Sequence, residues 1–544
     1  MSSFEERQPN YRFATKEPDH IMVSISGDAK TSMSVTWRTD TSIAGGFLRY
    51  REAGSGVEYT CEAVTRSFVS DVNTSHIHTA TPVNLKPGTK YLYTCGDTTH
   101  RSGEFWFTTE EEHCENFTFL LISDHQKDDD HYNPSYKAFN EKLKTVLRAH
   151  PEVRFILTAG DNTNCGQHEI QWNAMFEGME GVIEHLPYMM CCGNHDNRGF
   201  RQYFPVEVDR YYAEPAEFFN EQLMLSYPQN GPEGWRPENY SFDYGNAHFT
   251  VYGVNEPALV NDWSMADLDK TSKTWKIGAY HFPIYPSIPE GHNFDAYPMM
   301  RPCMERQDIL FSGHEHNFAR SFPMRNESIY DRPSEGTVHY MLGNSNANPP
   351  GSDSVQKVWH AAFHPQAEPV SMFGLVKIQG RKLTITGFFD DGRMVDECTI
   401  DKDKDLITPY ALAPVYRSVR TCFKGYALGL AGVNAVPEQV DGVWHLPFGT
   451  LAAFIGGTVI REKDKITIAF YRHRATYTCG SAIVQTDRGE LDMGHPVYRG
   501  AAGQLFIPID GACKPFDMTW TYAERNRFIN IQNEDEDKPF PEQP

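Results

Sequence analysis

The distribution of apolar and polar residues divides the chain into three parts with different periodicities. In the first part, Met33–Thr39 and Lys90–Cys95 alternate between apolar and polar positions, which is typical of half-buried strands. Turn-forming residues interrupt this part at 26–28, 54–56 and 86–89. Several short strands at such spacing predict a β-sandwich over about residues 18–110.

The second part, about residues 113–400, alternates between predicted strands and helices. Ser135–His150 carries an apolar face at helical spacing, and residues 171–185 are also predicted to be helical. This rhythm indicates an α/β core. Residues 373–400 return to strands, which we expect to form an extra β layer. Five apolar runs predict the buried strands of the core, at 117–122, 153–158, 187–192, 275–279 and 309–311.

The third part, about residues 408–532, contains an internal repeat. Its first copy begins at Val440–Phe448 and its second at Tyr498–Ile509, and each continues into further short apolar runs. It contains no clustered His and Cys set, so we expect a binding or docking appendage without catalysis. Residues 533–544 are acidic and rich in proline, which predicts disorder.

The length of 544 residues is compatible with two to four domains. We place the predicted domains at residues 1–112, 113–403 and 404–532, followed by the tail at 533–544.

The net charge of -22 argues against a nucleic-acid backbone or an anionic membrane as the main partner. It still allows a small phosphorylated substrate, because bound cations dominate a local field. No apolar run reaches about 18 residues, so no transmembrane helix is predicted. Residues 1–20 show no apolar core of a signal peptide. The compartment is therefore left open.

Candidate metal ligands follow the five predicted strands of the core. Side chains at strand ends are where α/β folds handle ligands. Asp, Asn and His ligands from five strand ends can hold two metal ions roughly 3.5–4 Å apart, which can clamp both oxygens of a phosphoryl transfer. The five blocks are Ser123–Gln126, Gly160–Asn164, Gly193–Asp196, Tyr280–Pro283 and Gly313–His316.

The candidate ligands divide between two metal sites. Asp161 is the natural bridging ligand, because one carboxylate between two cations lowers their mutual repulsion. Asp124 and His316 would complete the first site. The second site would be completed by Asn194, His281 and His314. Carboxylates and neutral imidazoles without thiolates suit two divalent or trivalent ions of Fe, Zn or Mn.

The five blocks in this order resemble the calcineurin-like metallophosphoesterase superfamily. Asn84–Tyr91 resembles the "L-x-P-x-T-x-Y" corner of fibronectin type III domains, and with such a domain in front the chain is most similar to the purple acid phosphatase family. The resemblance implies a fibronectin III-like β-sandwich followed by an α/β/β/α metallophosphoesterase sandwich. The C-terminal β-rich repeat domain resembles the copper amine oxidase-like N-terminal module of bacterial surface proteins. That likeness favours a secreted or cell-surface protein, with an intracellular protein as the alternative.

Two positions depart from the purple acid phosphatase pattern. Asn164 stands where the family usually has a tyrosine, so we expect a colourless protein without an assumed ferric site. Gln126 stands where the wider superfamily often has a metal-binding histidine. Two roles are open for Gln126: an oxygen ligand to the first metal, or a hydrogen-bond partner only. We expect His125 to point away from the site.

The resemblance implies hydrolysis of phosphate monoesters by a metal-activated hydroxide, as in an acid phosphatase. His195 would donate a proton to the leaving oxygen or hold the phosphoryl group, and Asn194 would contact the substrate. Asp196 either orients the imidazole of His195 or caps a turn. His292 is a candidate for substrate binding, with a solvated loop histidine as the alternative. For Arg320 we favour a structural ion pair over a phosphate contact.

Two rival functions are compatible with the same residues. A phosphodiesterase acting on nucleotides or phospholipid headgroups would use the same chemistry. An adhesion or scaffold protein with a degenerate phosphoesterase core would not use it, but six retained ligands argue against that, because converging polar groups are costly without a function.

Overall fold

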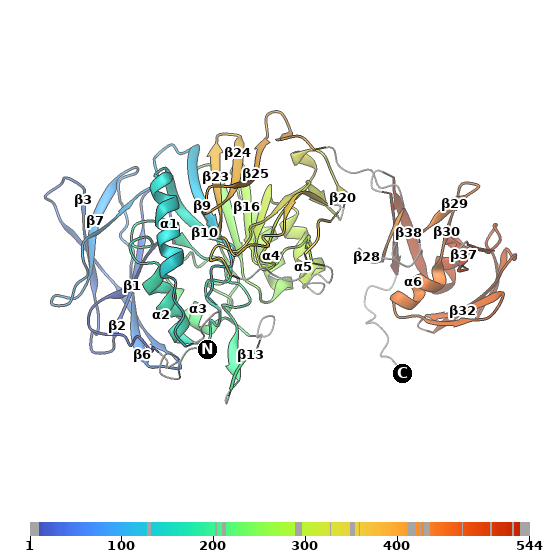
Figure 1. Ribbon diagram of the computed structural model, residues 1–544, viewed down its shortest axis with the longest axis horizontal. Coiled ribbons are helices and arrows are strands. Elements are labelled where there is room, and N and C mark those ends of the chain that lie inside the picture. The colour runs from blue at the N-terminus through green and yellow to red at the C-terminus, as the bar shows by residue number, and fades with distance from the viewer. Residues whose placement is uncertain are drawn as a thin grey trace. The chain divides into compact units, whose positions relative to one another are not determined.

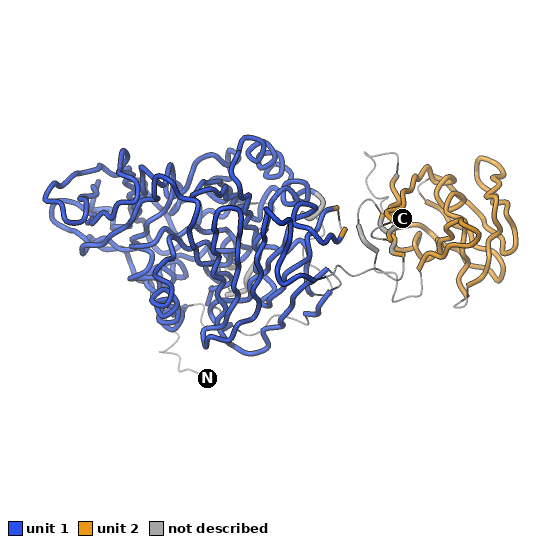
Figure 2. Tube along the Cα trace, turned by 90° about the horizontal axis from the view of Figure 1, so that it is seen from above, with its two compact units in different colours: residues 1–325, 329–413 blue, residues 326–328, 414–544 orange. Residues whose placement is uncertain are grey.

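We analysed the protein in a computed structural model, which falls into two compact units, residues 1–325 with 329–413, and residues 326–328 with 414–544 (Figure 2). Among the described residues, no helix is both long and apolar enough to cross a membrane. The structure describes residues 10–127, 132–201, 204–208, 214–288, 296–326, 328–348, 354–357, 359–411, 419–423, 426–428, 436–470, 472–500, 503–524 and 527–533.

The N-terminal part of the first unit is a β-sandwich of two four-stranded antiparallel sheets (Figure 1). One sheet has the order β1 (Asp19–Ser24), β2 (Ser34–Asp40), β6 (Thr74–Ala80) and β5 (Val64–Val69); the other has β4 (Tyr59–Glu62), β3 (Phe47–Glu52), β7 (Lys90–Gly96) and β8 (Phe105–Thr108). Trp37, Leu48 and Tyr93 are buried between them. The hydroxyl of Tyr91 accepts a hydrogen bond from the backbone of Lys86 at 2.9 Å, which resembles a tyrosine corner. The assignment to the fibronectin III class stays a prediction.

The rest of the first unit, called the mixed domain here, contains two seven-stranded sheets. The first has the order β11 (Tyr188–Met189), β10 (Val153–Thr158), β9 (Asn116–Ile122), β23 (Met372–Gln379), β24 (Lys382–Phe389), β25 (Met394–Asp401) and β26 (Leu406–Thr408). The second has the order β14 (Tyr240–Tyr244), β15 (Ala247–Tyr252), β16 (Trp275–Tyr280), β17 (Ile309–Ser312), β21 (Val338–Met341), β18 (Phe318–Ser321) and β22 (His360–His364).

The two sheets of the mixed domain pack face to face through aromatic side chains. Phe119 of the first sheet contacts Phe249 and Phe311 of the second, with ring centroids 5.4 and 6.1 Å apart. On the outer face of the first sheet, Phe139 of α1 (Lys137–Ala149) stacks on Phe373. The second sheet is covered by α4 (Pro257–Leu268), where Ser264 lies 2.8 Å from the Tyr252 hydroxyl. These contacts build the layers helix, sheet, sheet, helix.

The remaining described elements of the mixed domain are short. They are α2 (Glu169–Gly178), α3 (Glu217–Leu223), α5 (Ala296–Met304), η2 (Pro333–Glu335) and the strands β12 (Gly199–Arg201), β13 (Phe204–Val208), β19 (Met324–Arg325) and β20 (Ser328–Ile329).

Two sequence-based predictions about the mixed domain are corrected. Residues 373–400 do not form an extra layer, because β23 pairs with β9 and extends the first sheet. The periodicity of a strand identifies its buried faces but not the edge with which it pairs. The helix predicted over 171–185 ends at Gly178, where a Cβ atom would lie 2.1 Å from the Cβ of Tyr136.

Buried polar contacts join the sandwich to the mixed domain. Arg38 of β2 forms ion pairs with Asp19 at 2.7 Å and with Glu169 of α2 at 2.6 Å, and its side chain is only 1% exposed. The carboxylate of Asp71 accepts a hydrogen bond from the first backbone N–H of α2 at 2.9 Å, which satisfies a donor that has no partner inside a helix.

The second unit has its own hydrophobic core, which includes Leu446, Phe448, Ile468 and Tyr477. The order hairpin, helix, hairpin occurs twice in it. The first set is β29 (Glu438–Val440), β30 (Val443–Leu446), α6 (Phe448–Phe454), β31 (Thr458–Arg461) and β32 (Lys465–Phe470); the second is β36 (Tyr498–Arg499), β37 (Leu505–Pro508), α7 (Ile509–Cys513) with η4 (Lys514–Phe516), β38 (Met518–Ala523) and β39 (Phe528–Asn533). The other strands are β27 (Arg420–Phe423), β28 (Tyr426–Leu428), β33 (His473–Thr478), β34 (Ile483–Thr486) and β35 (Gly489–Asp492).

The likeness of this unit to the copper amine oxidase-like module stays a prediction. The acidic tail lies outside the described residues from 534 onward.

Candidate metal centre

Parallel strands of both sheets end at one place in the mixed domain. Asp124 follows β9, Asp161 follows β10, His281 follows β16, and His314 and His316 follow β17. The predicted strand before Asn194 is shorter than expected: β11 ends at Met189, and the N–H of Cys191 bonds to the hydroxyl of Thr158 at 3.0 Å instead of continuing a ladder. The structure thus brings all six predicted ligands together.

The backbone around these residues adopts conformations that non-glycine residues rarely adopt. Positive φ angles occur at Asp124 (47°), Asp161 (53°), His314 (75°) and His316 (53°). Such angles carry a conformational cost and gather at functional sites. All four of these positions carry candidate metal ligands.

Two glycines let the backbone come close to the carboxylates. A Cβ atom on Gly193 would lie 2.2 Å from Asp161 Oδ1, and one on Gly313 would lie 2.2 Å from Asp124 Oδ2. These distances are too short for any side chain. The glycines that open the third and fifth blocks are therefore required by the position of the acids.

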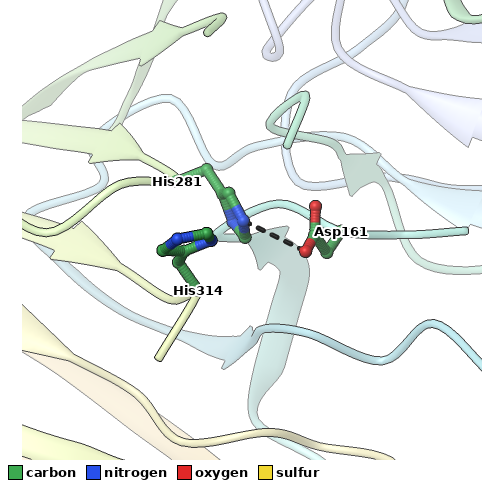
Figure 3. A group of neighbouring side chains, drawn as sticks. All are labelled: Asp161, His281 and His314. Carbon is green, nitrogen blue, oxygen red and sulfur yellow. Dashed lines mark ion pairs between the residues drawn. The ribbon is translucent and has the colours of Figure 1, made fainter. Parts of the chain in front are cut away.

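The second group consists of Asp161, Asn194, His281 and His314. His281 Nε2 lies 3.1 Å from Asp161 Oδ2 and 3.0 Å from Asn194 Oδ1, and His314 Nδ1 lies 3.1 Å from the same amide oxygen. Figure 3 shows His281 pointing at Asp161, with His314 beside it. Among the described residues, Asp161, His281 and His314 have ligand atoms within 4.8 Å of one another.

The first group consists of Asp124, Gln126, His316 and the shared Asp161. His316 Nε2 lies 3.6 Å from Asp124 Oδ1 and 3.4 Å from the amide nitrogen of Gln126. The same amide nitrogen lies 3.5 Å from Asp161 Oδ2. Asp161 therefore borders both groups, as expected for a bridging ligand.

The electrostatics of the second group fit a cation. His281 Nδ1 donates to the carbonyl of Ala159 at 2.9 Å, an arrangement common in metal-binding histidines. Its Nε2 then faces two oxygen acceptors and needs a proton or a cation between them. Burial lowers the pKa of His281, but Asp161 and Asp124 outweigh it and raise this pKa to about 9. Burial opposes the charge of Asp161, yet His281 and His195 hold its pKa below the ordinary value.

His195 lies at the open side of the second group. Its backbone N–H donates to Asp161 Oδ1 at 2.9 Å, and its ring Nε2 lies 3.8 Å from Asp161 Oδ2. The side chain is 19% exposed, against 1% for Asp161, so it can meet a molecule that arrives from solvent. The ring Nδ1 lies 2.9 Å from the carbonyl of Asn164 and 3.0 Å from the guanidinium of Arg198.

Asp196 does not orient the imidazole of His195. Its carboxylate accepts hydrogen bonds from the backbone of Asn162, Thr163 and Gly193 at 2.9–3.2 Å. It is fully buried, and burial together with the charge of Asp161 raises its pKa to about 6. Asp196 therefore clamps two ligand-bearing blocks to each other.

Three other candidates have clear positions. His125 points away from the site, as expected: Nε2 lies 2.8 Å from the Tyr188 hydroxyl, and burial lowers its pKa to about 3. Arg320 forms a two-point ion pair with Asp396 at 2.7 and 3.0 Å, which is the structural brace that we favoured. His292 lies outside the described residues.

The sequence analysis missed a polar loop that supports the first block. The side-chain amides of Asn346 and Asn348 donate to the carbonyls of His125 and Gln126 at 2.9 and 2.8 Å, and the N–H of Ser123 donates to the hydroxyl of Ser345 at 3.1 Å. This loop follows the buried strand β21, which runs parallel to β17. The polar residues shortly after this strand were the sequence feature that could have identified the loop.

Two regions of the chain match known protein families. Residues 117–318 match the calcineurin-like phosphoesterase family model, and residues 18–109 match the model of the purple acid phosphatase N-terminal domain. The chain therefore carries a metallophosphoesterase domain behind an N-terminal β domain. Over these two regions the chain is similar to the purple acid phosphatase family. Members of this family use a dinuclear metal centre.

Individual relatives are distant. "Acid phosphatase type 7" of Mus musculus is 24% identical over 60% of this chain and 78% of its own length. "Probable inactive purple acid phosphatase 1" of Arabidopsis thaliana is 24% identical over 68% of this chain and 67% of its own. Among solved structures, the purple acid phosphatase PPD1 from yellow lupin (Lupinus luteus) superposes with a TM-score of 0.58 at 18% identity, over 73% of this chain and 78% of the other. That likeness concerns the fold alone.

Proposed function

We propose that the protein hydrolyses phosphate monoesters of small molecules at two cations. The main support is that two adjoining groups of candidate ligands share one carboxylate. Asp161 Oδ2 lies 3.1 Å from His281 Nε2 in one group and 3.5 Å from Gln126 Nε2 in the other. In this proposal Asp124, Asp161 and His316 hold one ion, and Asp161, Asn194, His281 and His314 hold the other. Two bound cations of Fe, Zn or Mn would acidify water and offset the charge on phosphate oxygens.

The protein residues then position the substrate and move one proton. Asn194 and His195 are adjacent in the chain and flank Asp161, so an ester in the second group would lie within reach of both. His195 Nε2 would give its proton to the departing alcohol oxygen, as a general acid. Asp196 contributes indirectly, because it fixes the loops that carry Asp161 and Asn194.

The main rival is a phosphoesterase fold that has lost its activity. Some relatives carry names that call them probably inactive, and Asn164 and Gln126 depart from the family pattern. Against this rival, the site has positive φ angles and buried carboxylates, and both are costly in a fold that does not use them. A phosphodiesterase would use the same residues, so only its substrate preference distinguishes it from the proposed phosphomonoesterase.

The test is hydrolysis of p-nitrophenyl phosphate, an alkyl phosphate and bis-p-nitrophenyl phosphate by metal-loaded protein. We expect the monoesters to be preferred. Asp161→Asn should lose more than about 100-fold in kcat/KM, because even indirect partners of metal ligands are worth 10–100-fold. His195→Gln should slow the alkyl ester by about 10²–10⁴-fold and the nitrophenyl ester less, because that leaving group needs little protonation.

His113→Gln, a change at an exposed residue of the segment before β9, serves as the control and should leave all three rates unchanged. Hydrolysis by Asp161→Asn at the parent rate would refute the assignment of the site. A strong preference for the diester would instead favour the phosphodiesterase.

A further inference from the structure

The side chain of Gln126 lies in the first group, but the proposed function assigns only Asp124, Asp161 and His316 as ligands of the first ion. The residue is 1% exposed. Its backbone N–H donates to the carbonyl of Asp161 at 3.0 Å, and its carbonyl accepts from Asn348 at 2.8 Å. These two contacts hold the main chain, so the direction of the side chain is set by the fold.

The amide of Gln126 stands where a fourth ligand of the first cation would be. Its nitrogen lies 3.4 Å from His316 Nε2 and 3.5 Å from Asp161 Oδ2, and His316 Nε2 lies 3.6 Å from Asp124 Oδ1. Two ligands of a tetrahedral ion with bonds of about 2.1 Å lie about 3.4 Å apart. The spacing of these atoms is thus that of ligands around one ion.

The other end of the same amide has no hydrogen-bond partner. Gln126 Oε1 is buried and receives no donor from the described residues. A buried acceptor without a hydrogen bond destabilises the folded protein. A half-turn of the terminal amide exchanges its oxygen and nitrogen without other movement, and it would aim the oxygen at the space bordered by Asp161 and His316.

We propose that Gln126 binds the first cation through its side-chain oxygen, as the fourth protein ligand of that site. The inference deepens the proposed function and rests on it. The set then contains two carboxylates, of which Asp161 is shared, one imidazole and one neutral amide. It lacks a phenolate or thiolate, so it suits a divalent ion such as Zn²⁺ or Mn²⁺.

The test is a titration of metal-free protein with Zn²⁺ alone in competition with a chelating dye. The parent should bind two ions. Gln126→Met, which keeps the size of the side chain but removes its oxygen, should lower the affinity for one ion by at least about tenfold. The affinity for the other ion should not change. Gln126→Glu, which keeps an oxygen at this position, should bind two ions. Gln126→Asn, whose amide is one methylene shorter, should lower the affinity for the same ion as Gln126→Met does. It takes the place of the Met variant if that variant does not fold.

Gln307→Met is a matched control. Gln307 is also a buried amide, and its oxygen has no partner among the described residues. Its nitrogen donates to the Tyr252 hydroxyl at 2.7 Å, away from the site. This variant should bind two ions with parental affinity.

The outcomes separate the two proposals. Two ions bound by the Met and Asn variants within twofold of the parental affinities would overturn the role of Gln126 while leaving the proposed function intact. A parent that binds no pair of ions would overturn the proposed function itself. The role of Gln126 would be supported if Gln126→Met binds zinc more weakly than Gln307→Met does, while the metal-free proteins have equal melting temperatures.

Discussion

At the scale of single residues, the centre is defined by backbone geometry as much as by ligand type. Asp124, Asp161, His314 and His316 all have positive φ, at a cost of the order of 1 kcal/mol each. Neighbouring glycines make room for the carboxylates, and Asp196 ties two of the loops together. These features place ligands that the chain keeps more than 150 residues apart, such as Asp124 and His316, in one space.

The close approach at Gly313 yields a sharp prediction. In Gly313→Ala, the new Cβ would lie 2.2 Å from Asp124 Oδ2 and 2.0 Å from Ser123 Oγ, so Asp124 must move. We expect the affinity of the first ion to fall by about tenfold or more, measured by zinc competition. Gly45→Ala has no atom within 4 Å of its Cβ and should bind zinc like the parent. Equal affinity in both variants would mean that the position of Asp124 does not matter for the metal.

A second residue-scale prediction concerns pH and stability. His248 lies 2.8 Å from Asp243 and 3.0 Å from Asp267 through its two ring nitrogens. Burial lowers the pKa of His248, but the two carboxylates outweigh it and raise the pKa to about 9. Because this value is above that of an unfolded histidine, about 6.5, the stabilisation is complete below pH 6.5 and disappears as pH rises through 9.

We therefore expect His248→Gln to be less stable than the parent by about 1–2 kcal/mol at pH 6, after allowance for the half-exposed Asp243. The difference should shrink toward zero by about pH 9.5. Urea unfolding of both proteins across this range measures it. A difference that is independent of pH would show that the histidine is not charged in the folded protein.

At the scale of elements, the ends of parallel strands explain most of what the sequence could predict. The strands β9, β10, β16 and β17 are mainly apolar, and a polar candidate ligand follows shortly after the end of each one, so both strand and ligand were visible. The pairing of β23 with β9 was not visible, because hydrogen bonds between distant strands leave no mark on periodicity. The role of Asp196 was equally hidden, since it depends on donors in another block.

The link between sandwich and mixed domain gives an element-scale prediction. Arg38 is buried with Glu169, and the exposed pair Arg51–Glu104 offers a comparison. Removal of one partner leaves the other charge buried, so Arg38→Met should cost about 3–5 kcal/mol, whereas Arg51→Met should cost less than about 1 kcal/mol. Chemical denaturation measures both. Similar small losses would mean that the Arg38 contacts do not hold the sandwich in place.

At the scale of the whole molecule, the proposed chemistry is confined to one of the two units. All seven proposed metal ligands, Gln126 included, lie between residues 124 and 316, within the first unit. The second unit has a separate hydrophobic core, and we propose that it serves as a docking appendage. The net charge of -22 repels phosphorylated substrates in general, so attraction of the substrate would depend on the cations.

The most direct test of the account is anomalous diffraction from crystals of the protein grown with Zn²⁺. We expect two peaks roughly 3.5–4 Å apart, one beside Asp124 and His316 and one beside Asn194, His281 and His314, with Asp161 between them. A single peak, or peaks that none of these six side chains contacts, would contradict the dinuclear centre on which the proposed hydrolysis depends.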